Sequence, residues 1–185
     1  VAIVQARMDS SRLPKKVMAK VEGHPLIEIL LSRLANSKEI DEIVLATTYD
    51  ANDDELVHFV KSLGYRIYRG SRNDVLDRYY HAAVESNAEN VVRITGDCPL
   101  IDPSLVDEVI RRLRDEKSDF CCNHAYPDGL DVGAFTFKAL EKAWNHSTRE
   151  YDREHVTPYI SDSGLFSCSR ITSKKDYSTM RWTVD

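Results

Sequence analysis

Hydrophobic positions along the chain form two alternating patterns: short apolar runs and longer stretches with helical spacing. Runs of roughly four to eight apolar residues predict buried strands, and apolar residues at i, i+3 and i+4 predict helices. Strands are expected at 1–6, 42–48, 65–68, 91–95, 119–123, 134–137, 165–171 and 181–184. Helices are expected at 25–34, 52–63, 74–86, 102–113, 138–146 and 153–160. The alternation favours an α/β fold of Rossmann-like type, a mostly parallel mixed sheet flanked by helices.

Polar residues at the expected helix ends support these boundaries. Asn52 followed by Glu55 resembles a capping box, and Gly64 is a typical helix stop. Asp102 followed by Pro103 is a typical N-cap with proline in the first turn, so a structural role is expected for Asp102.

Charge is distributed unevenly along the 185 residues, whose net formal charge is −5. Residues 1–20 contain five basic side chains and one acidic one, a net charge of +4, so the rest of the chain carries −9. A chain with this balance has no basic field for a nucleic acid, and no nucleic-acid partner is expected. A small cationic patch on an acidic body suits a compact anionic ligand such as a polyphosphate.

The four cysteines do not form a metal or disulfide pattern. They occur at Cys98, Cys121, Cys122 and Cys168, without a C-x-x-C pair. No apolar run approaches the ~20 residues of a membrane span, and no signal-peptide pattern opens the chain. We expect a cytoplasmic protein with reduced thiols and no membrane partner.

The first candidate site is the polar segment 5–16, which directly follows the first strand. In an open α/β sheet, ligands bind beyond the carboxyl ends of the strands. The segment contains no glycine, so phosphate binding would depend on fixed charge, hydroxyls and loop amides rather than on a glycine-rich loop. A solvated basic loop is the alternative interpretation. The candidate phosphate ligands are Arg7, Ser10, Ser11, Arg12 and Lys16.

Two aspartates at expected strand ends could hold a metal ion. Asp97 follows the strand 91–95 and Gly96, and Asp185 follows the strand 181–184. Mg²⁺ usually takes one or two protein carboxylates together with phosphate oxygens and waters. The alternative for Asp97 is a turn aspartate that bonds its own backbone.

The remaining candidates lie in two further polar segments. Ser71 and Asp74 stand where a strand passes into a helix, so they could meet a ligand or merely cap that helix. Asp128, Asp131 and His155 could line a pocket for a polar substrate, although a structural histidine is equally compatible with the pattern at 155.

The order of these motifs resembles a known family. The matching stretches are QARMDSSRLPKKVM, RGSRNDVLDRYY, VVRITGDCPLIDP, YPDGLDV, REHVTPYI and RWTVD, which span nearly the whole chain. They resemble the spore coat polysaccharide biosynthesis protein F family, which is similar to the 3-deoxy-manno-octulosonate (CMP-KDO synthetase) and acylneuraminate cytidylyltransferases. The resemblance implies a nucleotidyltransferase fold, Mg²⁺ as cofactor, a homodimer, and transfer of CMP from CTP to a sugar, an acidic one, with release of pyrophosphate.

The resemblance also implies roles for individual residues. Arg7, Arg12 and Lys16 would be catalytic, Ser10, Ser11, Ser71 and Asp74 would bind the nucleotide, Asp128, Asp131 and His155 would bind the sugar, and Asp97 and Asp185 would hold Mg²⁺. A single nucleotidyltransferase domain would cover 1–185, with a nucleotide-binding part at 1–123 and a sugar-binding and dimerisation part at 124–185.

Three positions depart from the family pattern. Relatives commonly have glycine where this chain has Asp9 and Lys15, and glutamate where it has Gly133. The last change removes a carboxylate from the sugar side. Two alternatives therefore remain open: a glycosyltransferase that consumes a nucleotide sugar, although the chain contains no D-x-D, and a non-catalytic nucleotide-binding homologue.

Overall fold

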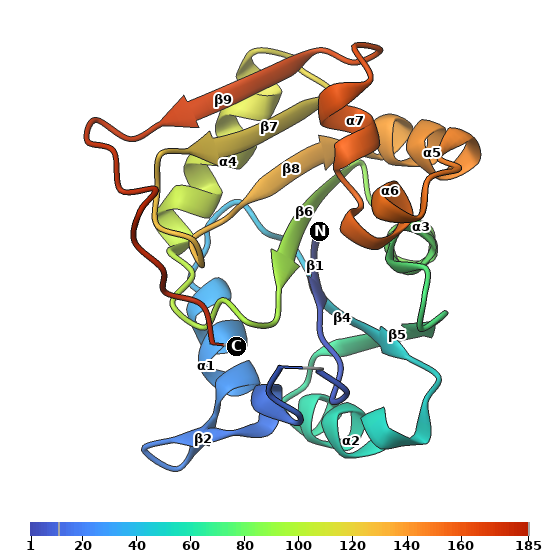
Figure 1. The fold of residues 1–185 in the computed structure, drawn as a ribbon, viewed down its shortest axis with the longest axis vertical. Coiled ribbons are helices and arrows are strands. Elements are labelled where there is room, and N and C mark those ends of the chain that lie inside the picture. The colour runs from blue at the N-terminus through green and yellow to red at the C-terminus, as the bar shows by residue number, and fades with distance from the viewer. Residues whose placement is uncertain (11, 185) are drawn as a thin grey trace.

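The computed structural model describes residues 1–10 and 12–184, and its elements follow the alternation expected from the sequence (Figure 1). The strands are β1 (Ala2–Gln5), β2 (Lys20–Val21), β3 (His24–Pro25), β4 (Ile43–Thr48), β5 (Arg66–Gly70), β6 (Asn90–Thr95), β7 (Phe120–His124), β8 (Gly133–Thr136) and β9 (Cys168–Thr172). The α-helices are α1 (Leu26–Leu34), α2 (Asp54–Ser62), α3 (Val75–Glu85), α4 (Pro103–Asp115), α5 (Phe137–His146), α6 (Glu150–His155) and α7 (Pro158–Asp162). Two 3₁₀ turns, η1 (Lys16–Met18) and η2 (Ala51–Asp53), complete the order.

Within the described residues, one seven-stranded mixed sheet runs in the order β5-β4-β1-β6-β8-β7-β9. β5, β4, β1 and β6 are parallel, whereas β8 is antiparallel to both of its neighbours. The expected α/β fold with a mostly parallel mixed sheet is confirmed. The parallel order brings the carboxyl ends of β1 and β6 together, since Gln5 pairs with Thr95.

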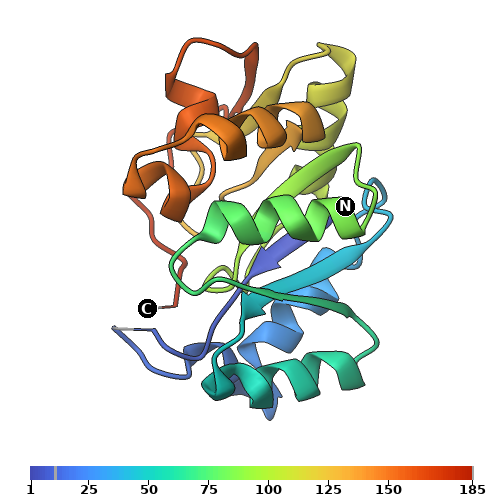
Figure 2. The same cartoon turned by 90° about the vertical axis from the view of Figure 1, so that its right-hand side faces the viewer.

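Helices cover both faces of the sheet, and each face has its own hydrophobic core. α1, α2 and α4 pack on one face, through residues such as Ile27, Leu56 and Leu105. α3, α5 and α7 pack on the other face, and Figure 2 shows α3 and α5 in front of the sheet. The central strands are buried on both sides, which explains why they are continuously apolar in sequence.

The structure corrects several expected boundaries. The helix expected at 153–160 is two helices, α6 and α7, because the chain turns at Val156 with a φ of 68°. The strand expected at 181–184 is a single parallel bridge between Asp128 and Arg181. The strand expected from 165 begins at Cys168. Asn52 is not a helix cap: it lies in the 3₁₀ turn η2, which precedes α2 and is capped by Asp50, whose side chain accepts from the Asn52 amide at 3.3 Å.

The remaining capping expectations are confirmed: Gly64 has a φ of 89° and follows α2, and Asp102 accepts from the Ser104 amide at 2.8 Å to cap α4. None of the helices in the described part of the chain has the length and apolar character needed to cross a bilayer.

Candidate active site

A cleft of about 510 Å³ opens at the carboxyl ends of β1 and β6. The two strand ends come close because Gly96 has no side chain: a Cβ there would lie 2.7 Å from the Ala6 Cβ. The lining is strongly polar and comes from the loop after β1, the start of α3, β6 and α6. Its charged members are Arg7, Arg12, Lys16, Arg72, Arg78, Arg93, Asp97, Glu150 and Glu154, with His155 beside them.

The basic loop after β1 is held in place by a buried aspartate. Asp53, 1% exposed, accepts from the Met8 amide at 2.7 Å and from the Thr47 hydroxyl at 2.8 Å. Within the loop, the Lys15 amide donates to the Met8 carbonyl at 2.7 Å. These bonds anchor the loop backbone at Met8 and Lys15, close to Arg7 and Lys16, which line the cleft.

Lys16 and Asp97 join the two halves of the cleft. Lys16 Nζ lies 3.4 Å from Asp97 Oδ2, and both side chains are largely buried. Burial by itself would raise the pKa of Asp97, but the hydrogen bond from Thr95 and the charge of Lys16 outweigh it, so the pKa lies below its ordinary value. Asp97 is therefore an ionised carboxylate facing the cleft at neutral pH.

The C-terminal segment returns to the backbone of Asp97. The Val184 amide donates to the Asp97 carbonyl at 2.9 Å, and the Trp182 amide donates to the Asp128 carbonyl at 2.7 Å. Gly129, with a φ of 103°, permits the approach, because a Cβ there would lie 2.7 Å from the Trp182 carbonyl carbon. Figures 1 and 2 both show the segment ending near the loop after β1. Asp185, the second expected metal ligand, is the next residue but lies outside the described residues, as does Ser11.

Two further arginines reach the cleft from the start of α3. Arg72 forms ion pairs with Asp9 and, at 3.0 Å, with Asp50. Arg78 is 3% exposed and donates to the carbonyls of Ser71 and, at 3.2 Å, Arg72. Burial lowers the pKa of Arg78, and the nearby charge of Arg7 lowers it further.

The opposite wall is α6, which presents Glu150, Glu154 and His155 to the cleft. An ion pair of 2.6 Å between Arg153 and Asp74 attaches this helix to α3. Asp74 also caps α3 by accepting from the Asp77 amide at 2.9 Å. Its carboxylate is thus engaged in helix capping and helix–helix contact.

The structure brings together six of the residues expected from the sequence: Arg7, Ser10, Arg12, Lys16, Asp97 and His155 all line the cleft. Four other expected residues, Ser71, Asp74, Asp128 and Asp131, do not line it.

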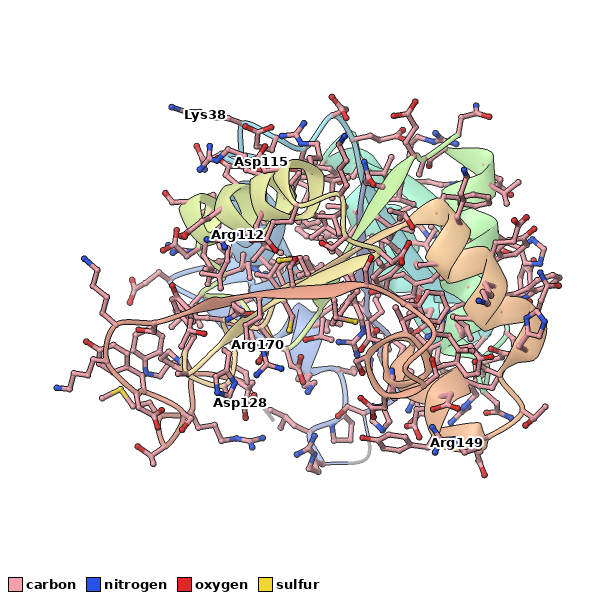
Figure 3. All side chains as sticks on the ribbon, turned by 90° about the horizontal axis from the view of Figure 1, so that it is seen from above. Lys38, Arg112, Asp115, Asp128, Arg149 and Arg170 are labelled. Carbon is pink, nitrogen blue, oxygen red and sulfur yellow. The ribbon has the colours of Figure 1, made fainter. Side chains whose placement is uncertain are left out.

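Asp128 and Asp131 lie in the turn before β8, beside the C-terminal segment. Asp128 pairs with Arg181 at 3.1 Å, and in Figure 3 it lies well apart from Arg149, which precedes α6. Asp131 accepts from the Gly129 amide at 2.9 Å. Desolvation raises the pKa of Asp131, and the neighbouring carboxylate of Asp128 adds to this rise.

Sequence reasoning missed several lining residues, most clearly Gln5, Arg72, Arg93, Glu150 and Glu154. Arg93 carried a usable signal, because it is a charged residue inside the apolar run VVRIT, where side chains alternate between the two faces. The glutamates also carried one, since positions 150 and 154 share a helix face with i, i+4 spacing. Arg72 carried none that distinguishes it from an ordinary surface arginine.

Cys98, next to Asp97, is not an activated thiol. It is 2% exposed, and burial raises its pKa to about 12. Reactive cysteines require the opposite shift and access to solvent.

The site suits a metal ion that takes part of its coordination from the oxygens of a bound phosphate ligand. Among residues 1–10 and 12–184, no three His, Cys, Asp or Glu side chains come together to hold a metal ion by themselves. Asp97 nevertheless offers an ionised oxygen ligand beside six cationic side chains suited to phosphates. One or two carboxylates with phosphate oxygens fit Mg²⁺ and do not fit zinc.

Comparisons with known proteins agree with this geometry. The sequence profile of the family described as Cytidylyltransferase matches residues 1–184. The spore coat polysaccharide biosynthesis protein SpsF of Bacillus subtilis is 33% identical over 85% of this chain and 71% of its own. A 3-deoxy-manno-octulosonate cytidylyltransferase of Geobacter sulfurreducens is 35% identical over 60% of this chain, which spans 44% of that relative.

The fold is also that of a solved relative. The structure of a cytidylyltransferase from Leptospira borgpetersenii superposes with a TM-score of 0.95 at 33% identity, covering 100% of this chain and 80% of the other. The resemblance expected from the motifs is confirmed. From the profile match, the shared identity and the shared fold together, we conclude that this chain belongs to the cytidylyltransferase family of nucleotidyltransferases.

Proposed function

We propose that the protein transfers CMP from CTP to a hydroxyl of an acidic sugar and releases pyrophosphate. The observation that carries the proposal is the convergence of Arg7, Arg12 and Lys16 with Asp97 in one cleft. Cations from the loop after β1 suit the triphosphate, and Asp97 suits the divalent ion that accompanies it. The names of the relatives, a cytidylyltransferase acting with 3-deoxy-manno-octulosonate among them, support cytosine as the base and an acidic sugar as acceptor.

In this mechanism the chain supplies position and charge. Arg7, Arg12 and Lys16 hold the β- and γ-phosphates and stabilise the negative charge that develops on the pyrophosphate leaving group. Ser10 and Ser11 donate hydroxyl hydrogen bonds to the same phosphates. Because Asp53 anchors the loop backbone at Met8, part of this arrangement is in place before CTP binds. Asp97 and Asp185 would hold Mg²⁺, which when bound neutralises phosphate charge.

The acceptor sugar lies on the opposite side of the cleft in this proposal. His155 with Glu150 and Glu154 offers hydrogen-bond acceptors to sugar hydroxyls. Asp128 and Asp131 would contact only a part of the sugar that extends beyond the lined cleft towards the C-terminal segment. Ser71 and Asp74 would support the nucleotide indirectly, Ser71 by accepting from Arg78 and Asp74 by capping α3. The acceptor hydroxyl attacks the α-phosphorus in line with the departing pyrophosphate.

The names of the relatives also bear on the biological role of the product. The SpsF name supports a role for the product in surface polysaccharide biosynthesis. We propose that the protein is cytoplasmic and that it forms a homodimer. Light scattering of the purified protein tests the homodimer, and a monomeric mass at micromolar concentration would contradict it.

The deciding experiment measures pyrophosphate release with each of the four nucleoside triphosphates, Mg²⁺ and a panel of acidic and neutral sugars. We expect release with CTP, together with a CMP-sugar detected by mass spectrometry. Release of a nucleoside phosphate from a nucleotide sugar, with no pyrophosphate release from any triphosphate, would support the glycosyltransferase alternative. CTP binding without turnover on any sugar would support a non-catalytic homologue.

A further inference from the structure

We infer that Arg93 is the residue that selects an acidic acceptor, by binding its carboxylate, and that Gly133 keeps Arg93 available for this role. The inference rests on the proposed function, because it assigns a group of the acceptor to a position in the same cleft. It adds a specificity-determining residue to a site whose loop cations, Arg7, Arg12 and Lys16, serve the phosphates in the proposed function.

Arg93 stands directly opposite Gly133. The two residues are antiparallel partners in β6 and β8, so their side-chain positions lie on the same face of the sheet. A Cβ at Gly133 would lie 3.3 Å from Phe120 and 3.8 Å from the Thr157 methyl group, which places this face under the α6–α7 connection. The cross-strand position where a carboxylate could neutralise Arg93 therefore carries no side chain.

Three polar atoms of the cleft are buried without a hydrogen-bond partner. They are Arg93 Nε, Arg78 Nε and Gln5 Oε1. Arg78 is 3% exposed, and Gln5 and Arg93 project from β1 and β6 on the same face as Ile3. A buried donor or acceptor without a partner costs free energy that native proteins normally avoid. Three such atoms in the lining of one cleft indicate a polar ligand that completes them.

The positive charge of Arg93 and Arg78 indicates which chemical group of the ligand binds to these unpaired atoms. Both donors belong to guanidinium groups, which match the two oxygens of a carboxylate. Tyr79 lies beside these two arginines, and its hydroxyl donates to the carbonyl of Ile3 at 3.0 Å. Across the cleft are the α6 side chains Glu150, Glu154 and His155. In the described part of the chain neither glutamate forms an ion pair, so neither neutralises Arg93.

This arrangement gives the two anionic groups of the substrates, the triphosphate and the sugar carboxylate, separate positions in the cleft. The loop cations Arg7, Arg12 and Lys16 come from the segment after β1, whereas Arg93 comes from within β6, before the carboxyl end of that strand. A sugar with its carboxylate on Arg93 would direct its hydroxyls towards Glu150, Glu154 and His155, which accept hydrogen bonds. The geometry thus favours an acceptor that carries both a carboxylate and several hydroxyls.

The test uses two substitutions of equal size, Gly133→Glu and Gly133→Gln. The glutamate places a carboxylate opposite Arg93, and the glutamine places an uncharged amide in the same space. We expect Gly133→Glu to raise the KM for the acidic sugar roughly 10- to 100-fold more than Gly133→Gln does, with the KM for CTP unchanged in both. Circular dichroism and Tm of the two variants control for the shared crowding against Phe120.

Arg93→Gln gives a second, independent measurement. We expect the KM for the acidic sugar to rise by a similar factor and the preference over the sugar whose carboxylate is reduced to an alcohol to disappear. Calorimetric binding of the free acidic sugar to the CTP-loaded protein, measured without Mg²⁺ so that no transfer takes place, should weaken in parallel. Equal KM values for the acidic and reduced sugars in the wild type, or an unchanged preference in Arg93→Gln, overturn the inference while leaving CTP turnover intact. Absence of CTP turnover with sugar binding still dependent on Arg93 overturns the proposed function instead.

Discussion

Lys16 Nζ lies 3.4 Å from Asp97 Oδ2, although 81 residues separate them in the chain. This contact links the basic loop after β1 to the acidic end of β6, so the groups that we propose for phosphate binding and for metal binding share one cleft. Replacing Lys16 by alanine should cost about 2–4 kcal/mol of transition-state stabilisation, a rate loss of roughly 30- to 1,000-fold.

Lys15 provides the matched control for this measurement. It is exposed and lies 3.7 Å from Glu55, outside the cleft lining. Steady-state kinetics of Lys15→Ala should remain close to the wild type. Near-normal turnover in Lys16→Ala would remove Lys16 from the mechanism.

Asp97→Asn should abolish the dependence of CTP binding on Mg²⁺, because the amide oxygen lacks the charge that a hard cation requires. The measurement is isothermal calorimetry of CTP with and without the metal. Asp102→Asn is the control, since asparagine caps a helix as well as aspartate does and Asp102 only caps α4. If Mg²⁺ changes the affinity for CTP as much in Asp97→Asn as in the wild type, Asp97 does not hold the metal ion.

The pKa of Asp97 should depend on Lys16. Its folded-state pKa lies below the ordinary value of 3.8, so ionisation stabilises the folded protein. This contribution is complete above the ordinary pKa and is lost as the pH falls through the lower folded-state value. Lys16→Met should raise the pKa of Asp97 and move the loss to higher pH. Carboxyl ¹³C titration by NMR measures both proteins, and identical pKa values would contradict the coupling.

Arg72 should compensate the negative charge that Asp9 brings into the loop after β1, where we propose that the phosphates bind. Asp9 pairs with Arg72, which is also held by Asp50. Arg72→Gln should therefore raise the KM for CTP roughly 2- to 5-fold, a small factor because the pair is half exposed. Adding Asp9→Asn should restore affinity, whereas additive losses in the double variant would show that Arg72 acts independently of Asp9.

Cys98 should resist alkylation in the folded protein. Its pKa of about 12 and its burial leave little thiolate at neutral pH. With iodoacetamide at pH 7.5, peptide mapping should find Cys168, which is exposed, modified before Cys98, and activity should persist. Early labelling of Cys98 with loss of activity would contradict this assignment.

Much of the fold follows from local patterns. The apolar runs and the helical spacing are properties of neighbouring residues, so the strands β1, β4 and β6 and the helices α1, α3 and α4 could be predicted. The break between α6 and α7 could not, because Val156 adopts a positive φ that its residue type disfavours. The bridge at Arg181 depends on the distant turn at Asp128.

By itself the sequence determined the order of the elements, the basic loop and the aspartate after β6, since each is encoded within a few consecutive residues. Only the tertiary structure decided which charges meet. Arg93 faces Gly133 because β8 joins β6 in one particular antiparallel register, and Arg72 meets Asp9 because two loops end at the same edge of the sheet. A shift of one residue in that register would turn every β8 side chain to the other face, so pairings of this kind require the assembled sheet.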